Sequence, residues 1–165
     1  RTDELTGLAN RRAFLQELEN VRQGDLLFLL DLNGFKPVND RFGHAAGDLL
    51  LQHVAHRLSR ITESGWVLAR LGGDEFALLA RAPRAPQECA QAISAAFSYP
   101  FHLAGIGDLP ISASIGAVIA DGEDDLLRRA DLAMYRAKRT GIPLFFWSAE
   151  LATGSNVATL NASKM

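Results

Sequence analysis

The sequence predicts an α+β domain in which helices cover one sheet. Short apolar runs of strand length are mixed with longer segments of helical periodicity, and two adjacent runs flank a pair of glycines, which is typical of an antiparallel hairpin. The 165 residues, 48% of them hydrophobic, suit one domain with a core of its own. A single cysteine, Cys89, excludes an internal disulfide and a cysteine-rich zinc site.

A helix, a buried strand and two further helices are predicted in the first part of the chain. Asn10 suits the N-cap of a helix that carries Phe14 on its apolar face. Residues 26–32 (LLFLLDL) have the length and the flanking glycines of a strand that is buried on both faces. A short helix stopped by Gly43 and a long helix over 45–61 follow.

The remaining predicted elements alternate between strands and helices. Residues 66–81 predict two short strands around the glycine pair, and residues 85–97 are helical in composition. The alternating, β-branched segment 109–120 predicts a strand. Acidic residues in 121–125 favour the start of another helix, and residues 144–147 (LFFW) predict a last strand.

The ends and the charge of the chain define its expected setting. Residues 1–147 are predicted to form the domain, and the small, polar residues 148–165 a flexible tail or linker. The chain starts at Arg1 without a leader, so we expect a piece of a longer protein. No apolar run approaches the roughly 20 residues of a membrane helix, so the expected location is the cytoplasm, including the cytoplasmic part of a larger membrane protein. A net charge of -2 disfavours nucleic acid as a partner.

Acidic residues near predicted strand ends are the first candidates for chemistry. Asp31 lies near the end of an apolar strand, where a carboxylate either caps the following turn or binds a hard metal ion. Asp74 and Glu75 follow Gly72 and Gly73, which let a bulky ligand approach the backbone. If this hairpin lies beside the strand of Asp31, three carboxylates meet at one end of the sheet. Such a cluster can hold Mg²⁺ over phosphate groups.

The segment after Asp31 offers further binding groups. Gly34 opens a short helix whose free backbone amides would face an anion. Asn39 and Asp48 could hydrogen-bond a purine edge, or could be an ordinary turn residue and a first-turn acid. Lys138 is typical of a solvated residue near a helix C-terminus. Neither an EF-hand spacing nor a P-loop motif is present in the sequence.

Together these residues resemble the GGDEF family, the diguanylate cyclase domains of bacteria, over nearly the whole chain to about Trp147. The signature stands at residues 70–76 as RLGGDEF. Four further blocks flank it in the order of the family, namely DELTGLANRR at 3–12, DLNGFKPVNDRFGHAAGD at 31–48, SIG at 114–116 and RRADLAMYRAK at 128–138. The resemblance implies a central five-stranded, mostly antiparallel sheet surrounded by helices, with the ferredoxin-like core of nucleotidyl cyclases and polymerase palms.

The activity that the resemblance implies is nucleotidyl transfer by a diguanylate cyclase. Two GTP molecules are joined into cyclic di-GMP and two pyrophosphates are released, as each 3′-hydroxyl attacks the other α-phosphate. Two Mg²⁺ ions per active site are implied, with Mn²⁺ as a substitute. One domain holds one GTP, so a homodimer is needed for catalysis. Attached sensor or phosphodiesterase domains are expected in the full-length protein.

The same resemblance assigns roles to residues by motif. Asp31 and Asp74 would coordinate the metal ions with the carbonyl of Leu32, and Glu75 would act at the reacting hydroxyl as metal ligand or general base. Backbone amides and lysines would bind the phosphates of GTP, and two polar side chains would bind its guanine. The implied GTP-binding residues are Gly34, Phe35, Lys36, Asn39, Asp48, Gly72, Gly73 and Lys138.

Three departures from the family pattern qualify this assignment. Glu63 and Trp66 replace the arginine and aspartate of the R-x-x-D product site, so no inhibitory product site is expected. Asn33 replaces a frequent second aspartate, which should be tolerated because Asp31 is the implied metal ligand. Ile142 stands where a basic residue is usual, so one triphosphate contact is expected to be missing. The alternative function is therefore a catalytically weak GTP-binding module that regulates an attached domain such as a phosphodiesterase.

Overall fold

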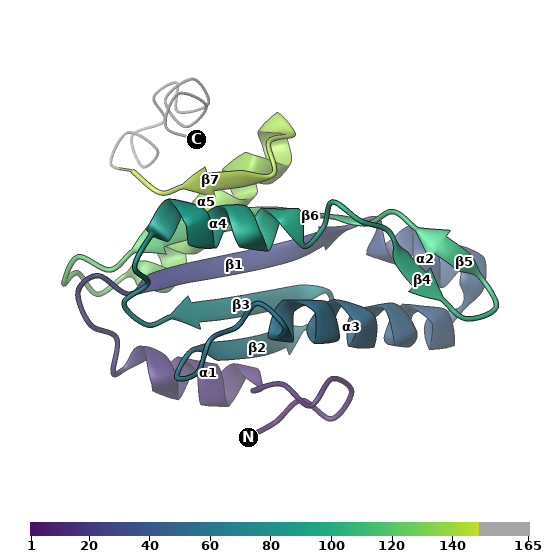
Figure 1. The fold of residues 1–165 in the computed structure, drawn as a ribbon, viewed down its shortest axis with the longest axis horizontal. Helices are drawn as coiled ribbons and strands as arrows, with labels where there is room; N and C mark the ends of the chain where they lie inside the picture. The colour runs from purple at the N-terminus through teal and green to yellow at the C-terminus, as the bar shows by residue number, and fades with distance from the viewer. Residues whose placement is uncertain (149–165) are drawn as a thin grey trace.

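The computed structural model describes residues 1–148, and Figure 1 shows how the elements are arranged. The helices are α1 (Arg11–Leu18), α2 (Phe35–Phe42), α3 (His44–Ser59), α4 (Pro86–Ala95) and α5 (Leu126–Thr140). The strands are β1 (Leu26–Asn33), β2 (Val67–Gly72), β3 (Glu75–Ala80), β4 (Phe101–Leu103), β5 (Gly107–Leu109), β6 (Ser112–Ile119) and β7 (Leu144–Phe146). Apart from Ser148, the predicted tail 148–165 lies outside the described residues.

The main sheet has five strands in the order β2-β3-β1-β6-β7. Strand β1 is central and pairs antiparallel with β3 on one side and with β6 on the other. Strand β7 joins the edge of β6 in parallel, so the sheet is mostly antiparallel. The prediction of an α+β fold with a five-stranded sheet surrounded by helices is confirmed.

Each face of the sheet buries its own layer of helices. Phe28 and Leu30 point to the face covered by α3 and α4, which cross the near side of the sheet in Figure 1. Leu27 and Leu29 point to the opposite face, where they pack with residues of α1 and α5. Successive side chains of a strand alternate between faces, so Asp31 continues the face of α1 and α5.

The strand predicted over 109–120 is divided in the structure. Strand β6 begins at Ser112, and residues 101–109 form a separate small hairpin of β4 and β5. Pro110 lies between the two parts and has no N–H to donate to a sheet ladder, which explains the break. The helix predicted over 85–97 is shorter in the structure, where α4 spans Pro86–Ala95.

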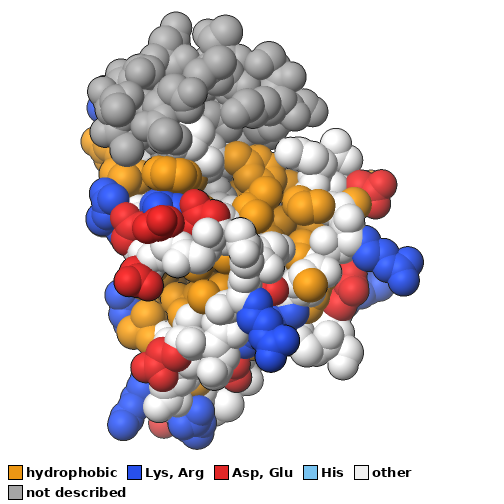
Figure 2. Space-filling view, turned by 90° about the vertical axis from the view of Figure 1, so that its left-hand side faces the viewer, with side chains coloured by type: hydrophobic (Ala, Val, Ile, Leu, Met, Phe, Trp, Pro, Cys, Tyr) orange, Lys and Arg blue, Asp and Glu red, His pale blue; other side chains and the backbone are white. Residues whose placement is uncertain are grey.

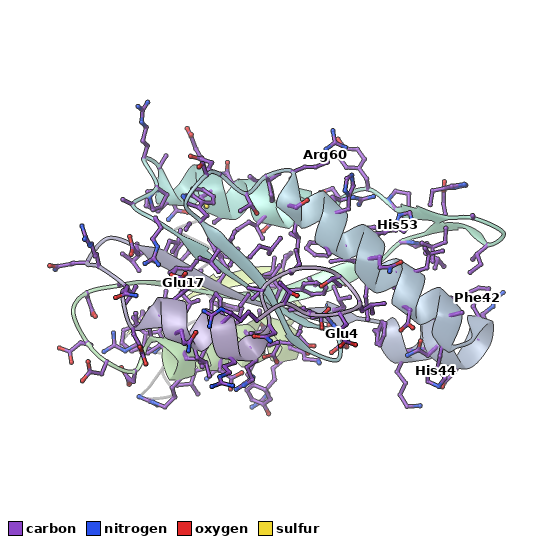
Figure 3. The ribbon with its side chains drawn as sticks, turned by 90° about the horizontal axis from the view of Figure 1, so that it is seen from below. Glu4, Glu17, Phe42, His44, His53 and Arg60 are labelled. Carbon is purple, nitrogen blue, oxygen red and sulfur yellow. The ribbon has the colours of Figure 1, made fainter. Side chains whose placement is uncertain are left out.

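A glycine separates α2 from α3 at one end of the molecule. Gly43 has a φ of 92°, which breaks the helical path and lets α3 begin at His44. Figure 3 shows Phe42 and His44 together at this end of α3 and Arg60 at the other. Of the two roles considered for Asp48, that of a first-turn acid is not met, because the first turn of α3 contains no acidic residue. Because α3 starts directly after Gly43, Asp48 falls in its second turn.

The opposite end of the molecule, where β1 begins, carries no surface of a single charge. Figure 2 views this end and shows acidic, basic and apolar side chains interspersed. The buried carboxylate of Asp25 lies here, where it accepts hydrogen bonds from the backbone N–H groups of Arg22 and Ala82 and from Arg81. Within residues 1–148, no helix has the length and apolar character needed to cross a membrane.

Helix α5 lies close against β6 at Gly116. A Cβ added to this residue would overlap the backbone of Ala130 and Met134 in α5. Gly47 in α3 offers a matched comparison, because a Cβ there would meet only the end of the Asn39 side chain. Gly116 therefore sets the distance between α5 and the sheet.

We expect Gly116→Ala to lower the free energy of unfolding by about 1–3 kcal/mol, because helix and strand backbones must separate to admit the methyl group. Gly47→Ala should leave the stability nearly unchanged, since a flexible side chain can move and alanine favours a helix by about 1 kcal/mol over glycine. Urea unfolding followed by circular dichroism measures both. Equal stability of the Gly116 variant and the wild type would contradict this account of the contact.

Candidate active site

The end of β1 and the turn between β2 and β3 lie side by side. Asp31 is paired with Glu75 in the register of β1 and β3. The backbone N–H of Leu32 donates to the carbonyl of Asp74 over 3.1 Å. The register of the two strands therefore brings Asp31, Asp74 and Glu75 to the same end of the sheet.

The turn that carries Asp74 is held by an arginine and by the start of the chain. Gly73 adopts a φ of 49°, in the left-handed region that suits glycine. The Nε and Nη2 groups of Arg70 donate to its carbonyl over 2.9 and 2.8 Å. The Nη1 group of Arg70 donates to Asp3 over 3.0 Å, and Asp3 also accepts from Thr6. Local sequence patterns do not predict this clamp, because Asp3 and Arg70 are far apart in the chain.

Like charges crowd around Asp31. Burial raises the pKa of Asp74, a hydrogen bond to Asp31 and the negative charge of Asp31 raise it further, and Lys138 opposes the shift. Burial also raises the pKa of Glu75, together with the charges of Asp31 and Asp131. Repulsion between these carboxylates would be relieved by a bound cation, so the site favours the uptake of positive charge.

The three carboxylates share one end of the sheet but are not arranged as one three-ligand metal cluster. In the part of the chain that the structure describes, no group of three or more His, Cys, Asp or Glu side chains is arranged to hold one metal ion. Asp31 and Asp74 are close enough to share a side-chain hydrogen bond. Glu75 begins β3 on the face of α1 and α5, which Asp31 shares, and it lines a hollow there with Arg11 and Asp131.

Lys138 of α5 reaches the same end of β1. Its Nζ atom lies 2.7 Å from Oδ2 of Asp31. This hydrogen bond is the main reason why the pKa of Lys138 is raised. The sequence alone indicated a solvated lysine, and the contact became visible only when the fold placed α5 across β1.

The departures at Asn33 and Ile142 meet in one small cavity beside Asp31. The cavity of about 260 Å³ is lined by both residues and by Lys138. Asn33 donates to the hydroxyl of Ser112 and accepts from that of Ser114, so its amide is tied to β6 rather than facing Asp31. Ile142 contributes an apolar side chain to the wall of the cavity.

Helix α2 presents its first backbone amides next to the end of β1. Gly34 precedes the helix with a φ of 87°, and the amides of Phe35 and Lys36 belong to the first turn, which has no intrahelical acceptors. Lys36 is exposed and forms an ion pair with Asp40 over 2.9 Å. Amides of this kind attract anions.

Asn39 of α2 lies against Gly47 of α3. The Oδ1 atom of Asn39 is buried and has no hydrogen-bond partner among the described residues. The absence of a side chain at Gly47 makes room for the Asn39 amide. Asp48, the next residue, is exposed at the surface of α3. An unpartnered buried acceptor is costly unless a ligand supplies the donor.

These features define a palm-like nucleotidyl cyclase fold with an acidic site at the end of its central strand. Residues 1–142 match the family model described as diguanylate cyclase, GGDEF domain, and the chain belongs to this family. The resemblance noted from the sequence motifs is confirmed.

Curated relatives include enzymes of cyclic di-GMP turnover. The chain is 36% identical to diguanylate cyclase DgcP of Escherichia coli (strain K12), with 84% of this chain and 44% of the relative covered. It is 40% identical to the bifunctional diguanylate cyclase/cyclic di-GMP phosphodiesterase MucR of Pseudomonas aeruginosa, with 84% of this chain and 22% of the relative covered. The chain thus spans less than half the length of these proteins.

Solved structures of the family share the fold. The isolated GGDEF domain of YfiN (TpbB) from Pseudomonas aeruginosa matches with a TM-score of 0.81 at 32% identity, covering 93% of this chain and 98% of that chain. The GGDEF domain of DgcB from Caulobacter crescentus, solved in complex with c-di-GMP, matches with a TM-score of 0.78 at 33% identity, covering 90% of this chain and 95% of that chain.

The charge crowding predicts that the signature acids destabilise the fold at neutral pH. A raised carboxyl pKa means that the folded state prefers the protonated form. The protonated carboxyl group therefore stabilises the fold at low pH, and this contribution is lost as the pH rises through the pKa of the folded state. We therefore expect Asp74→Asn and Glu75→Gln to raise the melting temperature at pH 7 by about 1–3 °C. The gain should vanish near pH 3, below the ordinary carboxyl pKa of about 4.

Thermal unfolding at the two pH values tests this, with Asp108→Asn on the exposed β4–β5 hairpin as the control. A lower melting temperature of both signature variants at pH 7 would show that these acids stabilise the fold instead.

Proposed function

We propose that this domain is a diguanylate cyclase that condenses two GTP molecules into cyclic di-GMP and releases two pyrophosphates. The observation that carries the proposal is the crowding of Asp31, Asp74 and Glu75 at one end of the sheet, beside anion-binding groups. The names of relatives such as DgcP support this activity. Each 3′-hydroxyl would attack the α-phosphate of the other nucleotide.

The chemistry of the acidic site fits Mg²⁺. Asp31 and Asp74 place two carboxylates together, and Mg²⁺ commonly binds one or two carboxylates while water and phosphate oxygens complete its shell. These two side chains and the carbonyl of Leu32 would hold two ions per site, for which Mn²⁺ could substitute. Bound there, divalent ions neutralise phosphate charge and help the attacking hydroxyl to ionise.

Glu75 is the residue proposed to act at the reacting hydroxyl. Its raised pKa makes it a better proton acceptor than an ordinary glutamate. Arg11 lowers the pKa of Glu75 and so opposes the effect of Asp31 and Asp131. As a general base, Glu75 would take the proton of the 3′-hydroxyl as that oxygen attacks.

The rest of GTP is proposed to lie along the groups next to the acids. The backbone amides of Gly34 and Phe35 would bind phosphate oxygens, with Lys36 and Lys138 contributing charge. The glycine pair 72–73 removes side chains that would obstruct the triphosphate.

Guanine is proposed to contact α2 and α3. The unpartnered Oδ1 of Asn39 can accept a hydrogen bond from an N–H group on the edge of the base. The exposed carboxylate of Asp48 can accept a second one from the same edge. Adenine presents a different pattern of donors there, so these two residues would distinguish the bases.

Catalysis is proposed to need a homodimer. One domain offers one set of GTP-binding groups, so the two reacting nucleotides must come from two domains that face each other across a two-fold axis. Glu63 and Trp66 do not supply the arginine and aspartate charges of the R-x-x-D site. The indole N–H of Trp66 instead donates a hydrogen bond to the carbonyl of Arg81. Inhibition by product at that position is therefore not part of the proposal.

A turnover assay tests the activity. With GTP and Mg²⁺ the protein should form cyclic di-GMP, and the rate per domain should rise with protein concentration. Asp74→Asn and Glu75→Gln should each lower this rate by about 10² or more, the scale of losing a key transition-state contact. Asp108→Asn serves as the control, and chromatography of the products measures the rate. The absence of product from folded, artificially linked dimers would refute catalysis.

The packing of Asn39 on Gly47 yields a test of base recognition. Gly47→Ala should push the Asn39 amide out of its place while the phosphate groups stay untouched. We expect the affinity for GTP to fall about 5- to 150-fold, as for losing one or two hydrogen bonds of about 1–1.5 kcal/mol each, with ATP affinity unaffected. Calorimetry on both nucleotides measures the difference. If the Gly47→Ala variant kept the wild-type preference for GTP over ATP, Asn39 would have no role in recognising guanine.

A second candidate function is favoured by Ile142. Its apolar side chain lines the cavity beside Lys138 in place of a basic residue, which removes one expected triphosphate contact. A domain weakened in this way could bind GTP and regulate an attached domain. The relatives include the cyclic di-GMP phosphodiesterase NbdA of Pseudomonas aeruginosa, 38% identical over 154 residues. Tight GTP binding without product formation, together with a GTP effect on a neighbouring domain, would select this function.

A further inference from the structure

The ion pair between Lys138 and Asp31 occupies the centre of the acidic site. The Nζ atom of Lys138 lies 2.7 Å from Oδ2 of Asp31, a distance typical of a charge-assisted hydrogen bond. The Asp31 side chain is 18% exposed and that of Lys138 is 53% exposed, so the lysine reaches inward from the surface to a mostly buried carboxylate. The lysine therefore neutralises the acid that is proposed to bind the metal ion.

The same carboxylate cannot serve the ammonium group and a divalent cation equally well. A metal ion bound to Asp31 would repel an ammonium group a few ångströms away, and solvent at the half-exposed Lys138 weakens the ion pair enough for exchange. Lys138 is free to swing away, because it lies in the last turn of α5 and is half exposed. A triphosphate arriving with the metal ion would offer the displaced ammonium group a new anionic partner.

We propose that Lys138 acts as a tethered counter-cation, which holds Asp31 before ligands bind and moves to the triphosphate when metal and nucleotide arrive together. This inference rests on the proposed function for the identity of the ligands. It adds that Lys138 opposes binding of the metal ion alone and favours binding of the metal–nucleotide pair. The lysine thereby couples the two binding events, and the coupling is reciprocal.

The direction in which the metal affinity changes when Lys138 is removed distinguishes this role from a structural one. If Lys138 only orients Asp31, its loss should weaken metal binding or leave it unchanged. If Lys138 competes with the metal ion, its loss should strengthen binding of the metal alone. In both cases the affinity for the triphosphate should fall, because a positive charge is lost.

The experiment measures Mn²⁺ binding to the full chain without nucleotide, by electron paramagnetic resonance. Lys138→Met is expected to bind Mn²⁺ about three- to tenfold more tightly than the wild type. The same variant should bind a non-hydrolysable GTP analogue with Mg²⁺ more weakly, by at least threefold. Lys138→Arg should behave like the wild type in both measurements, because it keeps the charge. Arg139→Met, which removes an exposed charge from the next position of α5, is the matched control.

The outcomes separate this inference from the proposed function. Mn²⁺ binding that is lost in Asp31→Asn but unchanged or weakened in Lys138→Met would overturn the counter-cation role and leave the proposed metal site intact. Wild-type Mn²⁺ binding that does not depend on Asp31 would overturn the metal site and the inference together. Circular dichroism of each variant confirms that the compared proteins are folded.

Discussion

The register between β1 and β3 is the constraint on which the site depends. It sets Asp31 opposite Glu75 and ties the backbone of Leu32 to that of Asp74. Carboxylates that repel one another are thus held together by backbone hydrogen bonds that are indifferent to charge. The apolar residues of β1, buried on both faces, stabilise this register, because a slip by one residue would expose them. The fold tolerates the repulsion between the carboxylates because burial of the apolar core contributes more to stability than the repulsion costs.

Positive groups around the acids limit this repulsion from two directions. Lys138 approaches Asp31 from α5, and Arg11 acts on Glu75 from α1. Neither of them removes the strain, since the pKa values of Asp74 and Glu75 remain raised. A site that stays short of positive charge is prepared to accept a cation, and such strain is common where function takes precedence over stability.

The sequence predicted the parts of the site that depend on local pattern. Asp31, Asp74 and Glu75 are candidates because charges stand out at the ends of apolar runs. The predicted N-cap at Asn10 is confirmed, since its side chain accepts a hydrogen bond from the Ala13 N–H. The β4–β5 hairpin was missed, since its strands are too short to show a period. The partner of Lys138 was missed as well, because it lies 107 residues away and only the packing of α5 brings the two together.

The packing of α5 links the stability of the fold to the chemistry of the site. Gly116 pairs with Leu29 on β1 and lets the backbone of α5 rest directly on β6. Met134 touches the sheet at this point, and Lys138 follows four residues later, which places it on the same side of the helix one turn further along. The reach of Lys138 to Asp31 is therefore set by the contact at Gly116. A larger residue there would lift the helix and withdraw the lysine from the acid, so a defect in the core would also be a defect in the charge balance of the site.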